Sequence, residues 1–422
     1  MVDGSLLCMV MKAKSNKGGD GVFVVIKENT EIISLKYQVS ERLEIPMQSL
    51  SLKFICEREK KFSISIDNDD DLNLMFEYCR RNGFTDANLY ESMVHATNPE
   101  SRVVIDVDGE RFRRLFISYN ACIEGFIAGC RPLLFLDRTF IKDRYRGMLL
   151  SATGYDGNQG IFPLAYCVCN QENEVNWKWF LQRLWTLLYD RKNPYQPPHR
   201  LVMISNTDKG IRTAVEEFFP DAFHSRCILH LVENIKKKMK DFGYKANITT
   251  MLGELLQSAA YKFTISEWDD DMKELACDRS QGLRHCNGIL PGEISKRAFS
   301  WYGHVTSNVV DSFNSWIRKA RLLRILPLIE TIRKQIIERM HERKLVGQKW
   351  SGYLCPEAEM VLCDNIQHGS YLAIKHSTED IVEVESNKTC RVDLKNRTYS
   401  CRSWDITRIP YKHACTTITW MG

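Results

Sequence analysis

Residues 132–140 read Pro-Leu-Leu-Phe-Leu-Asp-Arg-Thr-Phe, an apolar run that ends in the acid Asp137. A short apolar run bounded by proline and by polar residues predicts a buried β-strand. Two more apolar runs, at residues 148–155 and 161–169, predict further strands joined by a turn at residues 156–158. Asp137 is therefore expected to end the first strand of a sheet, where its side chain is available for chemistry.

Helices and strands alternate after residue 169. One amphipathic helix is predicted by apolar residues at spacings of three and four: Trp177, Phe180, Leu181, Leu184 and Leu188. The further elements expected are a strand at residues 201–205, a helix through Ala214 and Phe218, a short strand near Phe223 and a helix that begins near Cys227. Three strands, helix, strand, helix, strand, helix is the order of the ribonuclease-H-like fold. In that fold the first and fourth strands lie side by side.

A series of short motifs follows this order along the chain. They are residues 132–140, Tyr145-Arg146-Gly147, Asp156-Gly157-Asn158, Phe162-Pro163-Leu164-Ala165, Asn173, Trp177 with Trp179-Phe180, Lys209-Gly210, Phe219-Pro220, Cys227-Ile228-Leu229-His230 with Asn234, Ser307-Asn308-Val309-Val310-Asp311-Ser312-Phe313-Asn314, and Ala320-Arg321. In order, these motifs resemble the transposase domain of plant Mutator-like elements of the MuDR type. The resemblance implies an α/β core for DNA strand transfer, with Mg²⁺ or Mn²⁺ held by three acids.

The acidic positions that this resemblance implies are Asp137, Asn206 and Asp311. The family's second acid follows Ile-Ser, and here that position is Asn206, whose neutral amide weakens a metal site. Asp208 is a potential substitute, but on a continued strand it would sit about 6 to 7 Å further along, beyond a placement tolerance of roughly 0.5 Å. The third position holds Asp311 where the family usually has Glu, and Arg138 would compete with metal for the carboxylate of Asp137. We therefore expect catalytic activity to be lost.

Cys227 and His230 match the Cys-x-x-His signature that the resemblance implies. Their spacing places both on one face of a helix, so they could share a metal ion. Because two ligands do not close a zinc site, we favour a role in the core or in shaping the active site. A largely helical insertion is expected at about residues 235–300.

The N-terminal module spans residues 1–92. Apolar runs at residues 6–11, 21–26 and 50–56 predict strands, and residues 33–43 and 71–81 predict helices. This order suits a β-grasp domain. The module also resembles the Phox-and-Bem-type β-grasp domain, which implies association with other proteins.

An acidic turn leads into the second helix of this module. It contains Asp67, Asp69, Asp70 and Asp71. These carboxylates either stabilise the amino terminus of the helix or pair with a basic patch on a protein partner. Three lysines would supply the basic counterpart on this chain: Lys12, Lys14 and Lys17.

The C-terminal region, residues 346–422, contains a motif at about residues 390–416 that resembles a SWIM-type zinc finger. The resemblance implies Cys-x-Cys followed by Cys-x-His. Here tyrosines 399 and 411 replace two of the cysteines, which leaves Cys401 and His413 as half of a tetrahedral zinc site. Two further cysteines could complete the set, Cys390 and Cys415. We expect well under one equivalent of zinc in the purified protein.

Positive charge concentrates on predicted helices. The candidates for DNA contact are Lys236, Lys237, Lys238, Arg318, Lys319, Arg321 and Arg324. Clustered Lys and Arg neutralise phosphates and release counterions without base specificity. The alternative is a solvated helix face, because acidic residues follow at Glu330, Glu338 and Glu342.

The composition is that of an ordinary globular protein. The 422 residues are 44% hydrophobic and 26% charged, which excludes collagen-like and wholly disordered classes. The 58 Lys and Arg exceed the 53 Asp and Glu by a net charge of +5, too little to indicate a nucleic-acid partner by itself. Fifteen cysteines in this length are too dilute for a disulfide scaffold and favour a reducing compartment. The first residues do not resemble a secretory signal, and the sequence has no run of about 18 apolar residues, the length that a membrane-spanning helix needs. No membrane role is therefore predicted.

These observations predict four regions: a β-grasp association domain at 1–92, a linker at 93–111, a ribonuclease-H-like transposase domain at 112–345 and a SWIM-like region at 346–422. We expect a transposase-derived nuclear protein that associates with DNA, binds it with weak sequence specificity and is catalytically inactive. Two alternatives stay open. One is a functional DNA transposase that cleaves and joins DNA with divalent metal ions. The other is a β-grasp protein-interaction scaffold without a DNA role.

Overall fold

The structure is a computed structural model, and it divides the chain into two compact units. Unit 1 comprises Met1–Ala121 and Arg324–Ile329, and unit 2 comprises Cys122–Leu323 and Glu330–Gly422. The residues that the structure describes are 6–12, 21–27, 30–43, 46–50, 52–56, 62–81, 90–91, 94–95, 97–108, 111–143, 146–197, 200–206, 209–241, 243–262, 267, 270, 308–376, 378, 380–386, 389–396, 398–403 and 407–421. The domain boundaries expected from the sequence stay predictions.

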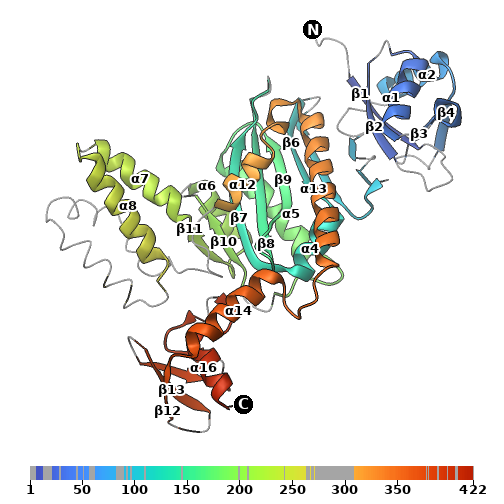
Figure 1. Cartoon of the computed structure of the whole chain (residues 1–422). Coiled ribbons are helices and arrows are strands. Elements are labelled where there is room, and N and C mark those ends of the chain that lie inside the picture. Colours follow the sequence, from blue (N-terminus) through green and yellow to red (C-terminus); the bar gives the residue numbers. More distant parts are fainter. Residues whose placement is uncertain are drawn as a thin grey trace. The chain divides into compact units, whose positions relative to one another are not determined.

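Unit 1 begins with two β-hairpins, each followed by a helix. Its elements are β1 (Leu6–Lys12), β2 (Gly21–Lys27), α1 (Ile32–Leu43), the 3₁₀ turn η1 (Met47–Ser49), β3 (Leu52–Cys56), β4 (Phe62–Ile66) and α2 (Asp69–Arg81). β1 pairs antiparallel with β2, and β3 pairs antiparallel with β4. The predicted order of strands and helices is present (Figure 1), and the β-grasp assignment itself stays a prediction.

A further hairpin of unit 1 lies within and beyond the segment predicted as a linker. β5 (Arg102–Asp108) pairs antiparallel with β6 (Arg111–Ser118). The buried hydroxyls of Tyr90 and Tyr119 lie 3.1 Å apart and share a hydrogen bond. Within the predicted linker at 93–111, the described residues that follow Ser101 therefore belong to β5 or β6.

The core of unit 2 contains five strands of a mixed sheet. β7 (Cys130–Phe140), β8 (Met148–Asp156) and β9 (Ile161–Cys169) pair antiparallel, whereas β10 (Val202–Ser205) and β11 (Phe223–Arg226) run parallel to β7. Their order across the sheet is β11-β10-β7-β8-β9. The prediction that the first and fourth strands lie side by side is confirmed by the pairing of β7 with β10.

Helices alternate with these strands and continue the predicted order. They are α4 (Asn120–Gly129), α5 (Glu174–Tyr189), α6 (Lys209–Phe218), α7 (Ile228–Asp241) and α8 (Ala246–Ala260). Asn173 caps α5, because its side chain accepts a hydrogen bond from the backbone N–H of Asn176 at 2.8 Å. The predicted apolar stripe of α5 is buried, with Trp177, Phe180 and Leu184 fully inaccessible to solvent. Helix α8 lies within the segment at about residues 235–300 where a helical insertion is predicted, and most of the rest of that segment lies outside the described residues.

The C-terminal part of unit 2 adds helices and a second sheet. After α12 (Asn308–Trp316) come η2 (Ala320–Leu322), α13 (Ile325–Gly347), α14 (Pro356–Gly369), β12 (Ala373–His376), β13 (Ile381–Glu385), β14 (Cys390–Asp393), β15 (Thr398–Tyr399) and α16 (Lys412–Met421). The four strands form an antiparallel sheet in sequential order, and α16 packs on α14, β13 and β14. This sheet lies at the end of the chain, beside α14 (Figure 1).

The predicted turn after β8 holds the start of α14. Cys355 donates its thiol to the carbonyl of Gly157 at 3.0 Å, and the N–H of Glu357 donates to the side chain of Asn158 at 3.0 Å. Arg343 of α13 forms an ion pair with Asp156 at 3.0 Å. The turn therefore connects the first sheet of unit 2 to the helices that precede its second sheet.

Within the described part of the chain, no helix combines the length and the apolar character needed to span a bilayer.

Candidate functional site

Asp137 lies within strand β7 and is almost completely buried, with 7% of its surface exposed. The expectation that it ends the strand is wrong, since β7 continues to Phe140. The reason is the pairing with β8, which matches Arg138 with Leu150 and Phe140 with Met148 and so extends the strand beyond the apolar run. Asp137 is paired with Ser151 of β8, whereas the pairing of β7 with β10 ends one residue earlier, at Leu136.

Asn206 follows directly on β10, the strand beside β7. The parallel register pairs Ile204 with Phe135 and Ser205 with Leu136, and Asn206 and Asp137 are the residues that follow this last pair. Residues two apart on a strand share a face, and Phe135 and Ile204 meet in one buried cluster. The first two predicted acidic positions therefore lie at the same end of this pairing. Asp208 lies outside the described residues.

Helix α12 brings the third predicted position to the same sheet, because it packs on β7, β8 and β9 (Figure 1). Asp311 lies in this helix. Asn314, one helical turn later, donates a hydrogen bond from Nδ2 to Oδ2 of Asp137 at 3.2 Å. Sequence reasoning did not assign Asn314 to the site. Its spacing of three from Asp311 was the available signal, because residues at i and i+3 share a helix face.

Arg138 points away from Asp137. Its guanidinium forms an ion pair with Glu172, ahead of α5, and lies 5.1 Å from the centre of the Phe140 ring. Adjacent residues of a strand project to opposite faces. The expectation that Arg138 competes with a metal ion for Asp137 is therefore wrong.

The predicted basic residues divide into exposed and engaged ones. Arg321 donates a hydrogen bond to Thr139 of β7, its carbonyl accepts the N–H of Lys142 at 2.8 Å, and burial lowers its pKa. Lys236 pairs with Glu233 at 3.4 Å. The remaining candidates are exposed, namely Lys237, Lys238, Arg318, Lys319 and Arg324. Arg321 thus secures the segment after α12 to β7, while the others remain accessible to a polyanion.

Cys227 is fully buried and belongs to the apolar cluster of β7 and β10. Its N–H donates to the carbonyl of Ser205 at 2.7 Å, which fixes the start of α7 beside the end of β10. His230 lies one turn later and is half-buried. Among the described residues, neither one belongs to a group of three potential metal ligands. This position fits a role in the core and in shaping the site.

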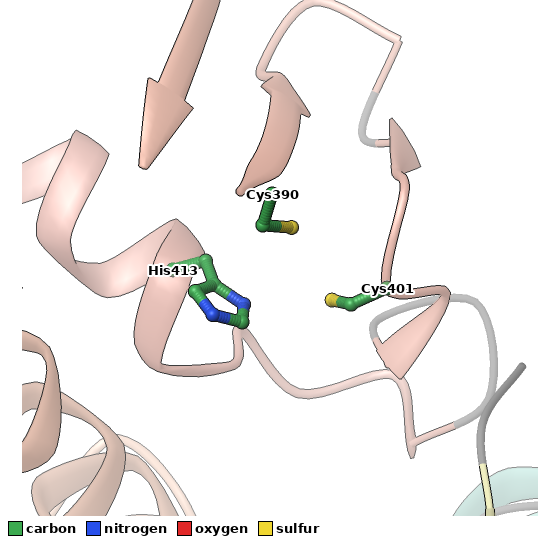
Figure 2. A group of neighbouring side chains, drawn as sticks. All are labelled: Cys390, Cys401 and His413. Atoms are coloured by element: carbon green, nitrogen blue, oxygen red, sulfur yellow. The ribbon is translucent and has the colours of Figure 1, made fainter. Parts of the chain in front are cut away.

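Three predicted or alternative zinc ligands meet in the C-terminal part of unit 2. Potential ligand atoms of Cys390, Cys401 and His413 all lie within 4.8 Å of one another. Cys390 begins β14, Cys401 follows β15, and His413 lies in the first turn of α16. Figure 2 shows the three side chains directed toward one another from these separate segments. The structure therefore adds Cys390 to the two ligands expected from the motif.

The donor set suits a zinc ion. Two thiols and one imidazole are ligand types that zinc prefers, and a Zn–S bond of about 2.3 Å in a tetrahedron implies sulfur atoms roughly 3.8 Å apart. His413 is 5% exposed, and its Nε2 lies 3.2 Å from Oγ of Ser386, a contact that orients the ring. Nδ1 of His413 is buried and has no hydrogen-bond partner among the described residues. A metal ion would give this nitrogen a ligand role.

Cys390 is electrostatically prepared to bind a cation. The adjacent thiol of Cys401, with His413 and Ser400, lowers the pKa of Cys390 against the opposing effect of burial. The pKa of Cys401 is raised, first by Cys390 and then by burial. The two thiols therefore favour holding one negative charge between them, and a bound cation would favour the second thiolate as well.

The other residues of the predicted motif are placed differently. Cys415 donates its thiol to the carbonyl of Pro410 at 3.5 Å and is outside the three-ligand group. Tyr399 is buried in the apolar core of the second sheet. Tyr411 is closer to the ligands: its ring centre lies 5.5 Å from that of His413, and burial, followed by the charge of Cys401, raises its pKa.

The acidic turn of unit 1 caps helix α2. Asp71 N–H donates to the side chain of Asn68 at 2.8 Å, and Oδ2 of Asp71 accepts from the N–H of Asn68 at 3.3 Å and of Asp67 at 3.0 Å. This is a reciprocal capping arrangement. Asp69 accepts the N–H of Ile32, the first residue of α1, at 2.6 Å. The carboxylates of Asp69 and Asp71 thus serve helix termini, whereas Asp67 and Asp70 are exposed. Lys14 and Lys17 lie outside the described residues, as does the side chain of Lys12.

Residues 133–234 match the family model of the MULE transposase domain. The matched segment runs from β7 into α7, so it includes Asp137, Asn206, Cys227 and His230. No curated protein sequence matches the chain. The match supports a Mutator-like transposase family for this chain and suggests a transposase-derived protein that interacts with DNA.

Proposed function

We propose that this protein is a nuclear, transposase-derived DNA-associated protein without strand-transfer activity. The observation that carries the proposal is the surroundings of Asp137. The residue that follows the adjacent strand β10 is the neutral Asn206, and an amide N–H of Asn314 donates to Oδ2 of Asp137 at 3.2 Å. DNA association rests on the match to the MULE transposase domain and on the exposed lysines and arginines.

The described side chains do not fit a two-ion centre. Such a centre needs several negative oxygens that clamp both the attacking and the leaving oxygen. Asp137 supplies one carboxylate, and Asn206 supplies at most a neutral amide oxygen. A weakly held ion cannot stabilise the charge that develops in the transition state, so the rate falls with metal occupancy. This argument supports loss of catalysis with retention of the fold.

The test measures Mn²⁺ binding and DNA strand transfer in the full chain and in Asn206→Asp. The donor DNA carries terminal inverted repeats of Mutator-like elements. We expect no strand transfer by the unmodified chain, and tighter Mn²⁺ binding in Asn206→Asp because a second carboxylate then faces Asp137. Asn247→Asp is the matched control, since it makes the same change at an exposed residue of α8.

Strand transfer by the unmodified chain that disappears in Asp137→Ala would establish the functional transposase instead. Arg138→Gly should change neither measurement, because Arg138 is paired with Glu172. Equal Mn²⁺ affinity in Asn206→Asp, in Asn247→Asp and in the unmodified chain would show that Asn206 is not the defect.

We also propose that zinc stabilises the C-terminal part of unit 2 through Cys390, Cys401 and His413. The ion would join β14, the segment after β15 and α16, three segments that are otherwise held by a small apolar core. A ligand set formed only in the folded chain contributes its binding free energy to folding.

A further inference from the structure

Cys390 begins β14, and Cys401 lies two residues after β15, the strand that pairs with β14. β14 and β15 pair Val392 with Tyr399 and Asp393 with Thr398. The N–H of Ser400 donates to the carbonyl of Arg391 at 3.0 Å, which continues the pairing by one step. β15 ends at Tyr399, and the N–H of Arg402 donates to the carbonyl of Tyr399 at 2.9 Å, so Cys401 lies in the turn that follows the strand. Cys390 and Cys401 both contact the apolar core of this sheet.

The two sulfur atoms are near enough for a disulfide to be considered. They lie within 4.8 Å of each other, and the S–S bond of about 2.05 Å requires the side chains to move toward each other. Figure 2 shows both thiols directed into the space that they share with His413.

We propose that Cys390 and Cys401 form a reversible disulfide that excludes metal from this group. Both thiols would be consumed, so His413 would remain as a single ligand, and one imidazole does not hold zinc. Conversely, zinc would occupy both sulfurs and protect them. The chain would then have two exclusive states, a metal-bound dithiolate and a metal-free disulfide. This inference rests on the proximity of the two sulfur atoms and on the zinc site proposed above, and it does not require the proposed DNA function.

The oxidant is a small-molecule disulfide such as oxidised glutathione. The thiolate of one cysteine attacks a sulfur of that disulfide, forms a mixed disulfide and releases one glutathione thiolate. The thiolate of the second cysteine then attacks the protein sulfur and releases the second glutathione. The two protein thiols lose two electrons and two protons, and the oxidant becomes two glutathione thiols. A dithiol reductant reverses the exchange.

The experiment uses the unmodified full chain, once loaded with zinc and once freed of metal by a chelator. Each sample is incubated with oxidised glutathione, its remaining thiols are blocked, and it is digested with trypsin. Cleavage at Lys388, Arg391, Arg397 and Arg402 releases Cys390 in peptide 389–391 and Cys401 in peptide 398–402. Mass spectrometry then identifies the linked pair directly. Cys363, which is exposed, reports that the oxidant has reacted.

We expect the linked pair 389–391 with 398–402 to be the main product of the metal-free chain and to decrease severalfold in the zinc-loaded chain. A zinc-sensitive dye should report release of the metal as the pair forms. Unmodified Cys390 and Cys401 in the metal-free chain, under conditions that convert Cys363, would overturn the proposal. Linkage of either cysteine to Cys415 as often as to its partner would overturn it too.

Equal formation of the linked pair with and without zinc would contradict the exclusive states and would locate the failure in metal binding. Because the disulfide is detected in the unmodified chain, a variant that fails to fold cannot produce this result.

Discussion

The hydrogen bond from Asn314 limits what Asp137 can bind. Nδ2 of Asn314 lies 3.2 Å from Oδ2 of Asp137, in a site that is almost closed to solvent. A divalent ion on that oxygen would have to displace the amide, and it would find the neutral Asn206 as its next ligand. The hydrogen bond from Asn314 satisfies one oxygen of this buried carboxylate. It is one of the contacts on which the proposed loss of strand transfer rests.

Asp137 and Asn206 could be located from the sequence, because each follows an apolar run with strand character. Asn314 could not be assigned in the same way, since its partner lies 177 residues away and the contact depends on how α12 packs on the sheet. Cys390 and Cys415 were likewise equivalent in the sequence. The folded chain separates them, because Cys390 belongs to the group with Cys401 and His413 whose ligand atoms lie within 4.8 Å of one another, and Cys415 does not.

A first prediction concerns the zinc ligands. Cys390→Ser should lower the zinc content of the dialysed protein several-fold, because a hydroxyl is a far poorer zinc ligand than a thiolate. Cys415→Ser is the matched control and should retain the zinc content of the unmodified chain, since Cys415 contacts the carbonyl of Pro410. Elemental analysis of the purified variants measures both. The opposite ranking would identify Cys415 as the third ligand.

A second prediction separates capping from association in the acidic turn. Asp71→Ala removes the acceptor of two backbone N–H groups and should lower the stability of α2 by about 1 kcal/mol. The equilibrium constant for local opening of α2 should then rise roughly fivefold. Hydrogen exchange at α2 in the full chain measures this. Asp67→Ala, an exposed change before the helix, should stay within about 0.5 kcal/mol. Equal hydrogen-exchange rates at α2 in the two variants would contradict the capping role and would favour the association surface.

At the scale of elements, the close approach of α14 and α16 positions the histidine of the zinc group. Gly369 ends α14, and the hydroxyl of Thr416 donates to its carbonyl at 2.8 Å. Thr416 lies one turn after His413 on α16. Neither the second sheet nor this contact was expected from the sequence, because strands of two to five residues with exposed polar alternation carry little periodic signal.

A third prediction tests this contact with Gly369→Ala. A Cβ there would lie 2.7 Å from the carbonyl oxygen of Lys412 and 2.8 Å from the hydroxyl of Thr416, so the helices must separate at a cost of about 1 to 3 kcal/mol. Because His413 moves with α16, zinc affinity should fall as well. Gly347→Ala is the control, since a Cβ there meets nothing within 4 Å. Zinc titration of both variants checks the expectation, which fails if the two bind zinc alike.

At the scale of the whole chain, the order of elements was the most predictable property. Apolar periodicity in long segments predicted the order of strands and helices in the core of unit 2, and sheet topology then placed the first and fourth strands together. Surface function was not predictable in the same way. Whether a cluster of lysines binds phosphate or only faces water depends on pairing and exposure, which periodicity does not report.

The last prediction concerns DNA binding by α7. Lys237, Lys238 and Lys240 are exposed, while Leu231, Val232 and Ile235 bury the other side of the helix. If these lysines bind phosphates, changing all three to Gln should weaken DNA binding alike for all sequences. It should also reduce the slope of log affinity against log salt by about 1 for each phosphate that is no longer neutralised. Fluorescence anisotropy over a range of salt concentrations measures both effects.

The matched control for this experiment removes the same charge elsewhere in unit 2, with Lys349, Lys375 and Lys395 changed to Gln. These lysines are also exposed, so the control lowers the net charge equally. An unchanged slope in the control with a smaller slope in the α7 variant would show direct phosphate binding, since counterion release depends on the phosphates neutralised locally and not on total charge. Equal losses in both variants would show that only the overall field attracts DNA. An unchanged slope in the α7 variant would leave α7 as a solvated face, and Arg318, Lys319 and Arg324 as the remaining exposed candidates.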